Sequence, residues 1–449
     1  MSVLSVSRPL ACSFPRRFPR AGKCASLLAV LLLLAACATG RVATPGTEEQ
    51  DSAETAPTTQ GATVKAPRPA VPVPAGGVRV GLLLPLSGEN APLGEALLHA
   101  AELALFDVGV DELTLVVRDT ESSAEGGARA AQSAMADGAR LMLGPLFAGQ
   151  VRPVAQATVS AGVNVVSFST DRTVAGGGAY VMGVLPDIQV DRVAGYAVAQ
   201  GYRRLGALVP NTPYGQAVVR ALQASAVRLH VQLTRIGFYD PAKPDLSPEV
   251  RQFAKDIGAE ALAAANTAAA AASGQVQTAP AAFAPGQNGL DIDALLLAEG
   301  GERLRIVAPL LLFYDVDPRR VKMLGTALWD DPRLAAEPAL ADGWFAAPPP
   351  DGWRAFAEHY RAIYGAAPPR LASLAYDAVT LAAALTRAGG PDPFGAAALT
   401  QPSGFAGVDG LFRFLPDGSV ERGLAVLTVT RQGIKPVDPA PTNFVPLVN

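Results

Sequence analysis

Cysteine is nearly absent from this chain of 449 residues: there are three, and all lie within the first 37 positions. No cysteine pair remains further along the chain for a disulfide, so a hydrophobic core must stabilise the body of the protein. Histidine is also scarce. His99, His230 and His359 are far apart, with no HExxH, no C-x-x-C and no carboxylate cluster at ligand spacing. These absences argue against a metal site.

The motifs of common catalytic and phosphate sites are missing as well. The chain has no G-x-S-x-G elbow and no G-x-x-x-x-G-K-[ST] loop. Gly176-Gly177-Gly178 precedes a short strand instead of opening a helix, so we interpret it as a flexible turn. The pairs Asp330-Asp331 and Glu48-Glu49 are interpreted as solvated charges. We therefore expect a protein that is not an enzyme and needs no cofactor.

The first 36 residues have the region order of an export signal. Basic residues without any acid precede an apolar run, 25–36, that is too short to span a bilayer comfortably. Leu34-Ala35-Ala36-Cys37 resembles the lipobox of bacterial lipoproteins, in which small residues admit the peptidase and the cysteine carries the lipid. The resemblance implies a signal peptide at 1–36 and lipidation of Cys37. An ordinary cleaved signal and an uncleaved anchor helix are the alternatives.

The same segment predicts the location of the protein. Ala38 stands where an Asp would resemble an inner-membrane retention signal, so the resemblance implies an outer-membrane lipoprotein facing the periplasm. Lipid chains anchor a protein strongly, because each buried methylene contributes about 0.8 kcal/mol. Removal of residues 1–36 takes away five basic residues and no acid, which changes the formal net charge from −3 to −8. This acidic balance argues against nucleic acid as a partner.

Residues 37–76 are predicted to be a disordered tether. They are rich in Pro, Thr, Ala, Gly and Glu, end in a run of alternating prolines, and have no apolar periodicity. Such a segment cannot bury enough surface to offset its ordering entropy, and its prolines favour extended conformations.

From Val78 onward, continuous apolar runs alternate with helical patterns, which is typical of parallel sheets covered on both faces. Two such series predict two α/β lobes. The first has strands expected at 78–84, 113–117, 141–143 and 163–168, with helices at 92–106, 124–136 and 149–160. The second has a helix at 188–200 and strands at 204–209, 231–238, 294–297 and 322–325.

The expected boundaries follow this alternation. Lobe 1 is predicted at 77–200 and lobe 2 at 201–341, with an alanine-rich insertion at 259–286. The chain is then predicted to return to lobe 1 over 342–405 and to lobe 2 over 406–435, with a hairpin closed at Asp417-Gly418 and a tail at 436–449.

Several motifs carry a family resemblance. Val80-Gly81-Leu82-Leu83-Leu84-Pro85-Leu86-Ser87-Gly88 with Leu93-Gly94-Glu95-Ala96 resembles the opening of leucine-binding-type periplasmic binding proteins. Further motifs follow in the family's order: Leu143-Gly144-Pro145-Leu146, Val166-Ser167-Phe168-Ser169-Thr170-Asp171, Pro213-Tyr214-Gly215 and Leu374-Ala375-Tyr376-Asp377-Ala378. The resemblance implies the type I fold, in which two doubly wound lobes are joined by a three-crossing hinge, here expected near 200–203, 340–343 and 404–408.

In that fold, ligands bind between the lobes, at the carboxyl ends of the strands. The resemblance implies a cleft lined by Ser87, Leu146, Phe147, Ser169, Thr170, Tyr214 and Trp329. Amino-acid binders of the family use small hydroxyl residues for the ligand carboxylate and an acid on the second lobe for its ammonium. This chain departs from that pattern, with apolar Leu146 and Phe147 on the first lobe and no acid before Asp330 after strand 322–325.

These departures resemble the penicillin-binding protein activators, lipoproteins whose binding-protein-like domain contacts a peptidoglycan synthase. The best-known activators also have an N-terminal helical-repeat domain, for which residues 38–76 leave no room. The leading hypothesis is a non-enzymatic regulator of this kind. The alternative is a substrate-binding lipoprotein of an ABC transporter for amino acids or related small molecules, and a hydrolase of cell-wall material ranks third.

The two leading hypotheses predict different surfaces. A transporter component needs a polar, ligand-sized cleft, whereas an activator is expected to have a filled or apolar cleft and an exposed patch on one lobe. Trp353, Phe356, Tyr360 and Tyr364 recur at helical spacing, so most are expected in the core, and any exposed aromatic side chain is a candidate anchor for a partner.

Overall fold

The computed structural model describes residues 77–273 and 286–444. The predicted signal peptide, Cys37 and the tether lie outside these residues, as do positions 274–285 of the predicted insertion and 445–449 of the tail. Within the described part of the chain, no helix is both long and apolar enough to cross a membrane.

The first lobe is built on a five-stranded parallel sheet in the order β2-β1-β3-β4-β5. Strand β1, which lies between β2 and β3, has one exposed residue, Arg79, among buried apolar ones, as expected for a strand covered on both faces. The strands are β1 (Val78–Leu84), β2 (Leu113–Asp119), β3 (Ala139–Leu143), β4 (Asn164–Ser167) and β5 (Ala179–Val181), with helices α1 (Ala91–Val108), α2 (Ala124–Ala136) and α3 (Ala148–Val159).

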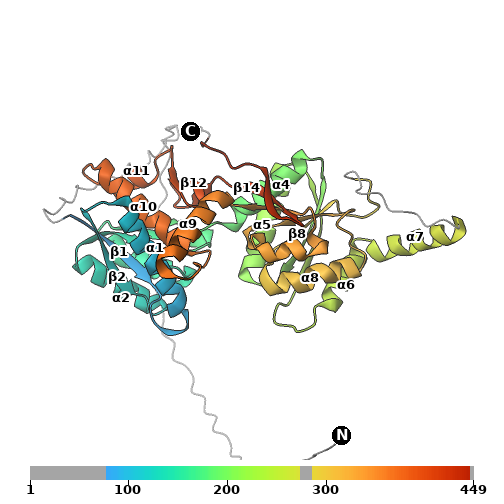
Figure 1. Cartoon of the computed structure of the whole chain (residues 1–449), viewed down its shortest axis with the longest axis horizontal. Helices are drawn as coiled ribbons and strands as arrows, with labels where there is room; N and C mark the ends of the chain where they lie inside the picture. The colour runs from blue at the N-terminus through green and yellow to red at the C-terminus, as the bar shows by residue number, and fades with distance from the viewer. Residues whose placement is uncertain (1–76, 274–285, 445–449) are drawn as a thin grey trace, which may run out of the picture. The chain divides into compact units, whose positions relative to one another are not determined.

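The second lobe has a seven-stranded sheet in the order β15-β14-β10-β9-β8-β6-β7, in which β14 pairs antiparallel with both β10 and β15 and all other pairs are parallel. Its strands are β6 (Arg204–Pro210), β7 (Gln232–Tyr239), β8 (Ala294–Leu297), β9 (Lys322–Gly325), β10 (Trp344–Ala347), β14 (Ala425–Thr430) and β15 (Gly433–Asp438). Its helices are α4 (Pro186–Ala199), α5 (Pro213–Arg228), α6 (Ser247–Asp256), α7 (Ala259–Ser273) and α8 (Gly301–Phe313). Helix α7, the start of the alanine-rich insertion, extends away from α6 (Figure 1).

Between β10 and β14 the chain returns to the first lobe. This segment contains α9 (Pro350–Tyr364), α10 (Ala372–Ala388), α11 (Ala396–Leu399) and a small antiparallel sheet of β11 (Phe405–Gly407), β12 (Gly410–Phe414) and β13 (Val420–Arg422). Helices α1, α9 and α10 lie side by side on this lobe (Figure 1). Short 3-10 helices occupy Gly88–Asn90, Arg172–Val174, Ala327–Trp329, Pro332–Ala336 and Pro338–Leu340.

The three crossings between the lobes differ from their expected positions. Helix α4, expected at the end of lobe 1, packs Val190, Val193 and Ala197 into the core of the second lobe. The first crossing therefore lies at 182–185, directly after β5, and the second and third lie at 348–349 and 423–424. Periodicity predicts that a helix has an apolar face but does not indicate which sheet that face covers.

The expected closing hairpin is correct only in part. A tight turn at Pro416-Asp417-Gly418 does reverse the chain, with the Leu415 N–H donating to the Ser419 carbonyl. The strand that pairs with β12 is the short β13, however, while β14 leaves to join β10 in the second sheet. Strand β15 also occupies the start of the segment predicted as a tail.

Two glycines allow a close approach between a helix and the turn before it, once in each lobe. A Cβ at Gly94 in α1 would lie 1.9 Å from the Pro85 carbonyl oxygen, and one at Gly215 in α5 would lie 2.0 Å from that of Pro210. Backbone atoms cannot move aside as a flexible side chain can, so glycine is required at both positions.

Gly94→Ala is expected to lower the free energy of unfolding by about 1 to 3 kcal/mol, because the helix must shift away from Pro85. The matched control is Gly149→Ala in α3, where the new Cβ meets open space, and this change is expected to be neutral or stabilising by up to about 1 kcal/mol. Urea unfolding of both variants checks the difference, and equal stabilities would show that the close approach imposes no constraint.

Candidate functional site

A cavity of about 810 Å³ lies at the carboxyl ends of strands from both lobes, and we call it the cleft. The first lobe contributes Ala148, at the start of α3, and the loop 170–173 that follows β4. The second lobe contributes the first turn of α4 and one side of α5 from Pro213 to Ala224. Loops and helix N-termini at this edge of a parallel sheet are a common place for ligands in α/β proteins.

Much of the cleft wall is apolar. Of its four charged side chains, Asp171, Arg172 and Asp187 have partners within the protein, whereas Arg220 on α5 has none among the described residues. The apolar part consists of Ala148, Pro186, Pro213, Ala217, Ala221 and Ala224. The Arg172 guanidinium contacts Asp187 at 2.6 Å and Asp417 at 3.0 Å, and so links the loop after β4 to α4 and to the β12–β13 turn. Asp171 accepts hydrogen bonds from the N–H and hydroxyl of Thr173. Both acids that line the cleft, Asp171 and Asp187, therefore already have partners.

Three further acids follow strands of the second lobe, and each also has a partner. Glu299, directly after β8, accepts a hydrogen bond from the Tyr239 hydroxyl at 2.6 Å and one from the Gly300 N–H at 3.0 Å. Asp331 forms an ion pair with Arg333 at 2.7 Å, and this hydrogen bond lowers the pKa of its carboxyl. Asp330 lies 3.8 Å from Arg370 of the first lobe.

Sequence analysis did not identify Glu299, although its position gave a signal. It is the acid nearest to the carboxyl end of a buried parallel strand in the second lobe. It was missed because the resemblance directed the search to the next strand, β9.

The residues predicted to line the cleft fall into different environments. Thr170 and Tyr214 line it, while Phe147 sits immediately before Ala148 and packs against the core of the first lobe. Ser169 is buried, and its hydroxyl accepts a hydrogen bond from the Asp171 N–H. Leu146 is buried as well. The cavity thus brings together two of the seven residues predicted to line the cleft.

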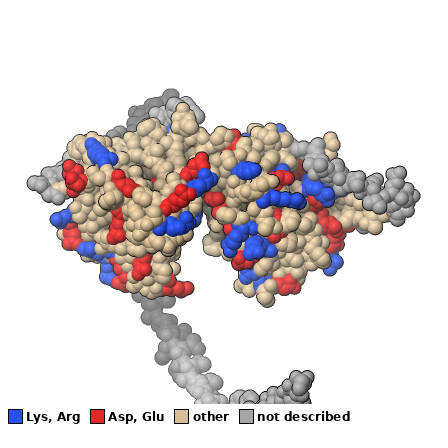
Figure 2. All heavy atoms as spheres, viewed as in Figure 1, with Lys and Arg blue, Asp and Glu red and all other residues tan. Residues whose placement is uncertain are grey.

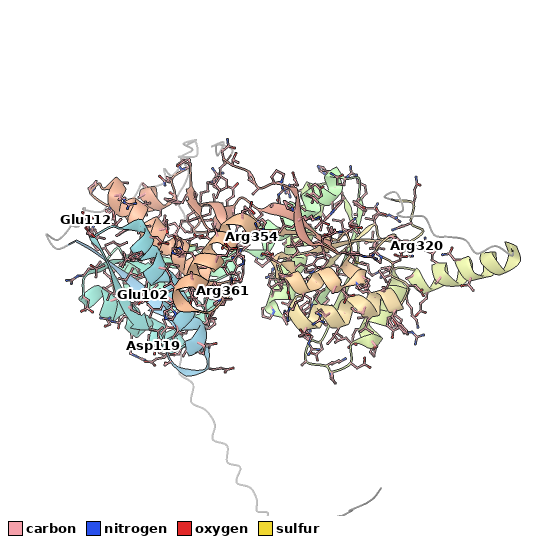
Figure 3. All side chains as sticks on the ribbon, in the orientation of Figure 1. Glu102, Glu112, Asp119, Arg320, Arg354 and Arg361 are labelled. Atoms are coloured by element: carbon pink, nitrogen blue, oxygen red, sulfur yellow. The ribbon has the colours of Figure 1, made fainter. Side chains whose placement is uncertain are left out.

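Ser87 is exposed in the loop after β1, and its side chain forms a hydrogen bond with Asp119. Asp119 is the last residue of β2 and is labelled in Figure 3. Burial raises the pKa of the Asp119 carboxyl, but hydrogen bonds from Ser87 and from the Leu86 N–H outweigh this effect and leave the pKa below its ordinary value. Asp119 therefore stays ionised and holds the loop after β1.

Trp329 belongs to the core and not to the cleft wall. Its side chain is fully buried and packs against Phe345, with the two ring centroids 6.2 Å apart. A Cβ at Gly325 would lie 2.2 Å from the indole, so that glycine makes room for the ring. The 3-10 turn directs Trp329 inward and leaves the neighbouring Leu328 46% exposed. The expectation that Trp329 contacts a ligand is wrong for this reason.

A second hollow, of about 480 Å³, lies on the first lobe between α1 and α9, and we call it the α1–α9 groove. Within it His99 stacks on Tyr364 with ring centroids 4.4 Å apart, and the Tyr364 hydroxyl donates to the His99 carbonyl at 2.9 Å. Phe356 and Tyr360 are buried, as their spacing predicts. The other lining residues are Pro92, Leu93, Ala96, Ala366, Ala367 and Pro369.

Large apolar side chains are exposed on the same two helices. Phe106, two turns after His99 on α1, is 80% exposed, and Ile363 on α9 is 50% exposed. Charged side chains of both signs accompany them, including Glu102 on α1 and Arg361 on α9 (Figure 3). On the face shown in Figure 2, acidic and basic residues are mixed and form no single basic patch.

Two α/β lobes, joined by three crossings and separated by a cleft at the carboxyl ends of their strands, define a bilobed binding protein. Residues 77–434 match the periplasmic binding protein family, and the chain belongs to it. The predicted type I fold is thereby confirmed. No curated protein matches the sequence.

Solved structures with this fold share little sequence with the chain. An ABC transporter substrate-binding protein from Sphaerobacter thermophilus has a TM-score of 0.62 at 15% identity, over 82% of this chain and 98% of its own. LivJ from Streptococcus pneumoniae, in complex with isoleucine, has a TM-score of 0.53 at 17% identity, over 81% of this chain and 100% of its own. A solute-binding protein from Rhodopseudomonas palustris, in complex with benzoate, has a TM-score of 0.52 at 17% identity, over 82% of this chain and 98% of its own.

Beside the cleft, the Tyr214 hydroxyl donates to the fully buried Thr326 hydroxyl at 2.9 Å. Burial raises the pKa of Tyr214 to about 12, so the phenol is neutral at any physiological pH. Thr326→Val removes the acceptor with little change of shape and is expected to cost about 1 to 3 kcal/mol in the free energy of unfolding.

The double variant Tyr214→Phe, Thr326→Val should recover part of that cost, because both polar partners are then replaced by apolar groups. Chemical denaturation of the two single variants and the double variant measures the coupling. Strictly additive effects would show that the bond contributes nothing.

Proposed function

We propose that the protein is a non-enzymatic, lipid-anchored regulator whose binding-protein domain contacts a peptidoglycan synthase, as the penicillin-binding protein activators do. The observation that carries this proposal is that the protein itself engages the acids that follow the strands of the second lobe. A buried ammonium without a carboxylate partner is costly. Glu299, Asp330 and Asp331 each already have a donor or cation, so a free amino acid would have to displace one of them.

The apolar character of the cleft supports the same proposal. Leu146 is buried and Phe147 packs on the core at the position where amino-acid binders have a small hydroxyl residue. Alanine and proline line much of the wall, and Leu328 is exposed at the carboxyl end of β9. These features are the ones expected of an activator.

The α1–α9 face of the first lobe is the proposed contact surface. Exposed aromatic and aliphatic side chains beside an apolar groove are typical anchors of protein interfaces. Phe106 and Ile363 provide the side chains, and the groove between their helices provides the pocket.

The proposal includes a lipid anchor: Cys37 attaches the protein to the outer membrane, and the tether connects the lipid to the domain that begins near Val78. It is supported by the order of the signal segment and by Ala38 after the cysteine. A periplasmic synthase is within reach of a domain held in this way.

A second candidate function is substrate binding for an ABC transporter. The cavity itself favours it, because about 810 Å³ is enough for a small ligand, and Thr170 and Tyr214 face it. Proteins of the same fold are solved with isoleucine and with benzoate, which shows that the fold accepts ligands with and without an ammonium group.

Phe106→Glu and Ile363→Glu are each expected to weaken binding to a penicillin-binding protein at least about tenfold, since losing an interface anchor costs 1.4 kcal/mol or more. The loss of affinity is measured by pull-down and by titrating the penicillin-binding protein over the immobilised lipidated protein. The matched control is Val227→Glu on α5, a residue 77% exposed on the second lobe. Binding by all three variants at the unaltered level would reject the α1–α9 face as the contact surface.

A thermal-shift series with amino acids, benzoate, small peptides and peptidoglycan fragments separates the two functions. A ligand at a hundred times its Kd should stabilise the fold by about 2.7 kcal/mol. The regulator is expected to show no shift with any single amino acid. A clear shift with one of them, abolished by Thr170→Val, would favour the transporter function instead.

A further inference from the structure

A cluster of buried charges lies beside the first and third crossings. Asp377 on α10 and Asp409 in the β11–β12 turn are each 1% exposed, and Arg422, the last residue of β13, is 4% exposed. Asp377 accepts hydrogen bonds from the Val408 N–H at 2.6 Å and the Asp409 N–H at 3.3 Å. Such burial is costly for charged groups unless they balance one another.

Arg422 connects two of the crossings. It donates from Nε at 3.2 Å and from Nη2 at 2.6 Å to the carbonyl of Met182, the first residue of the first crossing. Arg422 itself immediately precedes the third crossing. Its Nη1 is buried without a hydrogen-bond partner among the described residues, so its charge is balanced by nearby carboxylates and not by solvent.

Arg370 connects the cluster to the second lobe. Its Nη2 lies 2.7 Å from Asp409 Oδ1, and its Nε lies 3.8 Å from Asp330, which follows the 3-10 turn after β9. The Ser373 hydroxyl donates to the other Asp409 oxygen at 2.8 Å. The cluster therefore joins both lobes and two of the crossings between them.

The charge of the cluster depends on Asp377. With Asp377 neutral, Asp330 and Asp409 balance Arg370 and Arg422, whereas an ionised Asp377 adds one uncompensated negative charge. Burial raises the pKa of Asp377 to about 7, the charge of Asp409 acts in the same direction, and Arg422 and the two N–H groups oppose them. Asp377 thus exchanges its proton near neutral pH.

Other titratable groups pack around α10 but are engaged elsewhere. The Tyr376 hydroxyl donates to Asp107 of α1 at 2.9 Å, and His359 of α9 lies 3.4 Å from the same carboxylate. His359 belongs to this second network and is the histidine used in the control below.

We propose that Asp377 acts as a proton-controlled latch of the hinge. Protonated, it leaves the charges around Arg370 and Arg422 balanced and so favours the arrangement described here; ionised, it is repelled by Asp409 and favours an arrangement in which its carboxylate is better hydrated. The direction of the pH effect follows from the linkage between proton binding and conformation. The arrangement in which the carboxyl binds its proton more tightly is favoured at lower pH. The distance between the lobes therefore changes as the pH rises through neutrality, whichever of the two proposed functions holds.

Distance measurement between spin labels tests this directly. Labels at Gln156→Cys on α3 and Gln223→Cys on α5, both exposed, report on the two lobes in the full chain with its three native cysteines changed to serine. In the unaltered hinge, the distance distribution is expected to shift between about pH 5.5 and about pH 8.5, with a midpoint near the pKa of Asp377. No shift over this range overturns the proposal.

Asp377→Asn removes the titration while keeping the shape and the neutral state, so its distribution should match that of the acid form at every pH. His359→Gln is the matched control and should leave the shift intact. A shift that persists in Asp377→Asn, or that disappears in His359→Gln, assigns the effect to another group and contradicts the latch.

Stability provides a second readout that does not depend on the labels. For a carboxyl whose pKa is raised by folding, stability is highest below the ordinary pKa of 3.8 and falls as pH rises toward about 7. The difference in urea midpoint between the unaltered protein and Asp377→Asn should therefore grow across this range in favour of the variant. A constant difference contradicts the proposal, and should the variant fail to fold, the label distances of the unaltered hinge still decide it.

Discussion

The two large sheets of this protein contain parallel strands buried on both faces, and the need to cover those faces determines most of the architecture. Strands such as β1 and β8 are almost entirely apolar, so helices must pack on each side of them. Each helix runs back across its sheet, which places the carboxyl ends of neighbouring strands at the same edge. The loop 170–173, the first turns of α3 and α4 and one side of α5 form the cleft at these edges.

Polar groups near these edges are only partly hydrated, so they take partners inside the protein. Glu299 binds Tyr239, Asp119 binds the loop after β1, and Arg172 is shared between Asp187 and Asp417. The same requirement produces the charge cluster at the crossings, where solvent cannot reach Asp377 or Arg422. A cleft whose acids are already engaged differs chemically from one prepared for an amino acid, although the fold is the same.

Sequence reasoning was reliable where the signal is local. The apolar run 78–84 and the helical pattern 124–136, with Ser123 accepting a hydrogen bond from the Gly126 N–H at its start, correspond to β1 and α2 within a residue. The order of motifs from Val80 to Asp377 indicated the family, which the match over residues 77–434 supports independently. Hydrophobic periodicity and capping depend on residues a few positions apart, so a single sequence contains them.

The errors have a common cause. Helix α4 was recognised as a helix but assigned to the wrong lobe, and Trp329 was placed in the cleft although its neighbour Leu328 is the exposed residue. An apolar face matches either sheet, and a 3-10 turn of three residues has no periodicity from which to tell inside from outside. Glu299 was overlooked because the family resemblance pointed to β9, and its hydrogen bond to Tyr239, which is distant in the sequence, leaves no local pattern.

The sequence by itself determined the class of the protein: an α/β chain with two alternating series, the motifs of a binding-protein family and a signal segment ending at Cys37. These properties follow from local patterns of apolar, small and turn-forming residues. Only the tertiary structure decided which sheet each returning segment joins and which acids near the cleft already have partners. It also decided that Asp377, Asp409, Arg370 and Arg422 meet at the hinge. Those outcomes depend on long-range packing, since a buried charge is stabilised by whichever groups the fold brings to it.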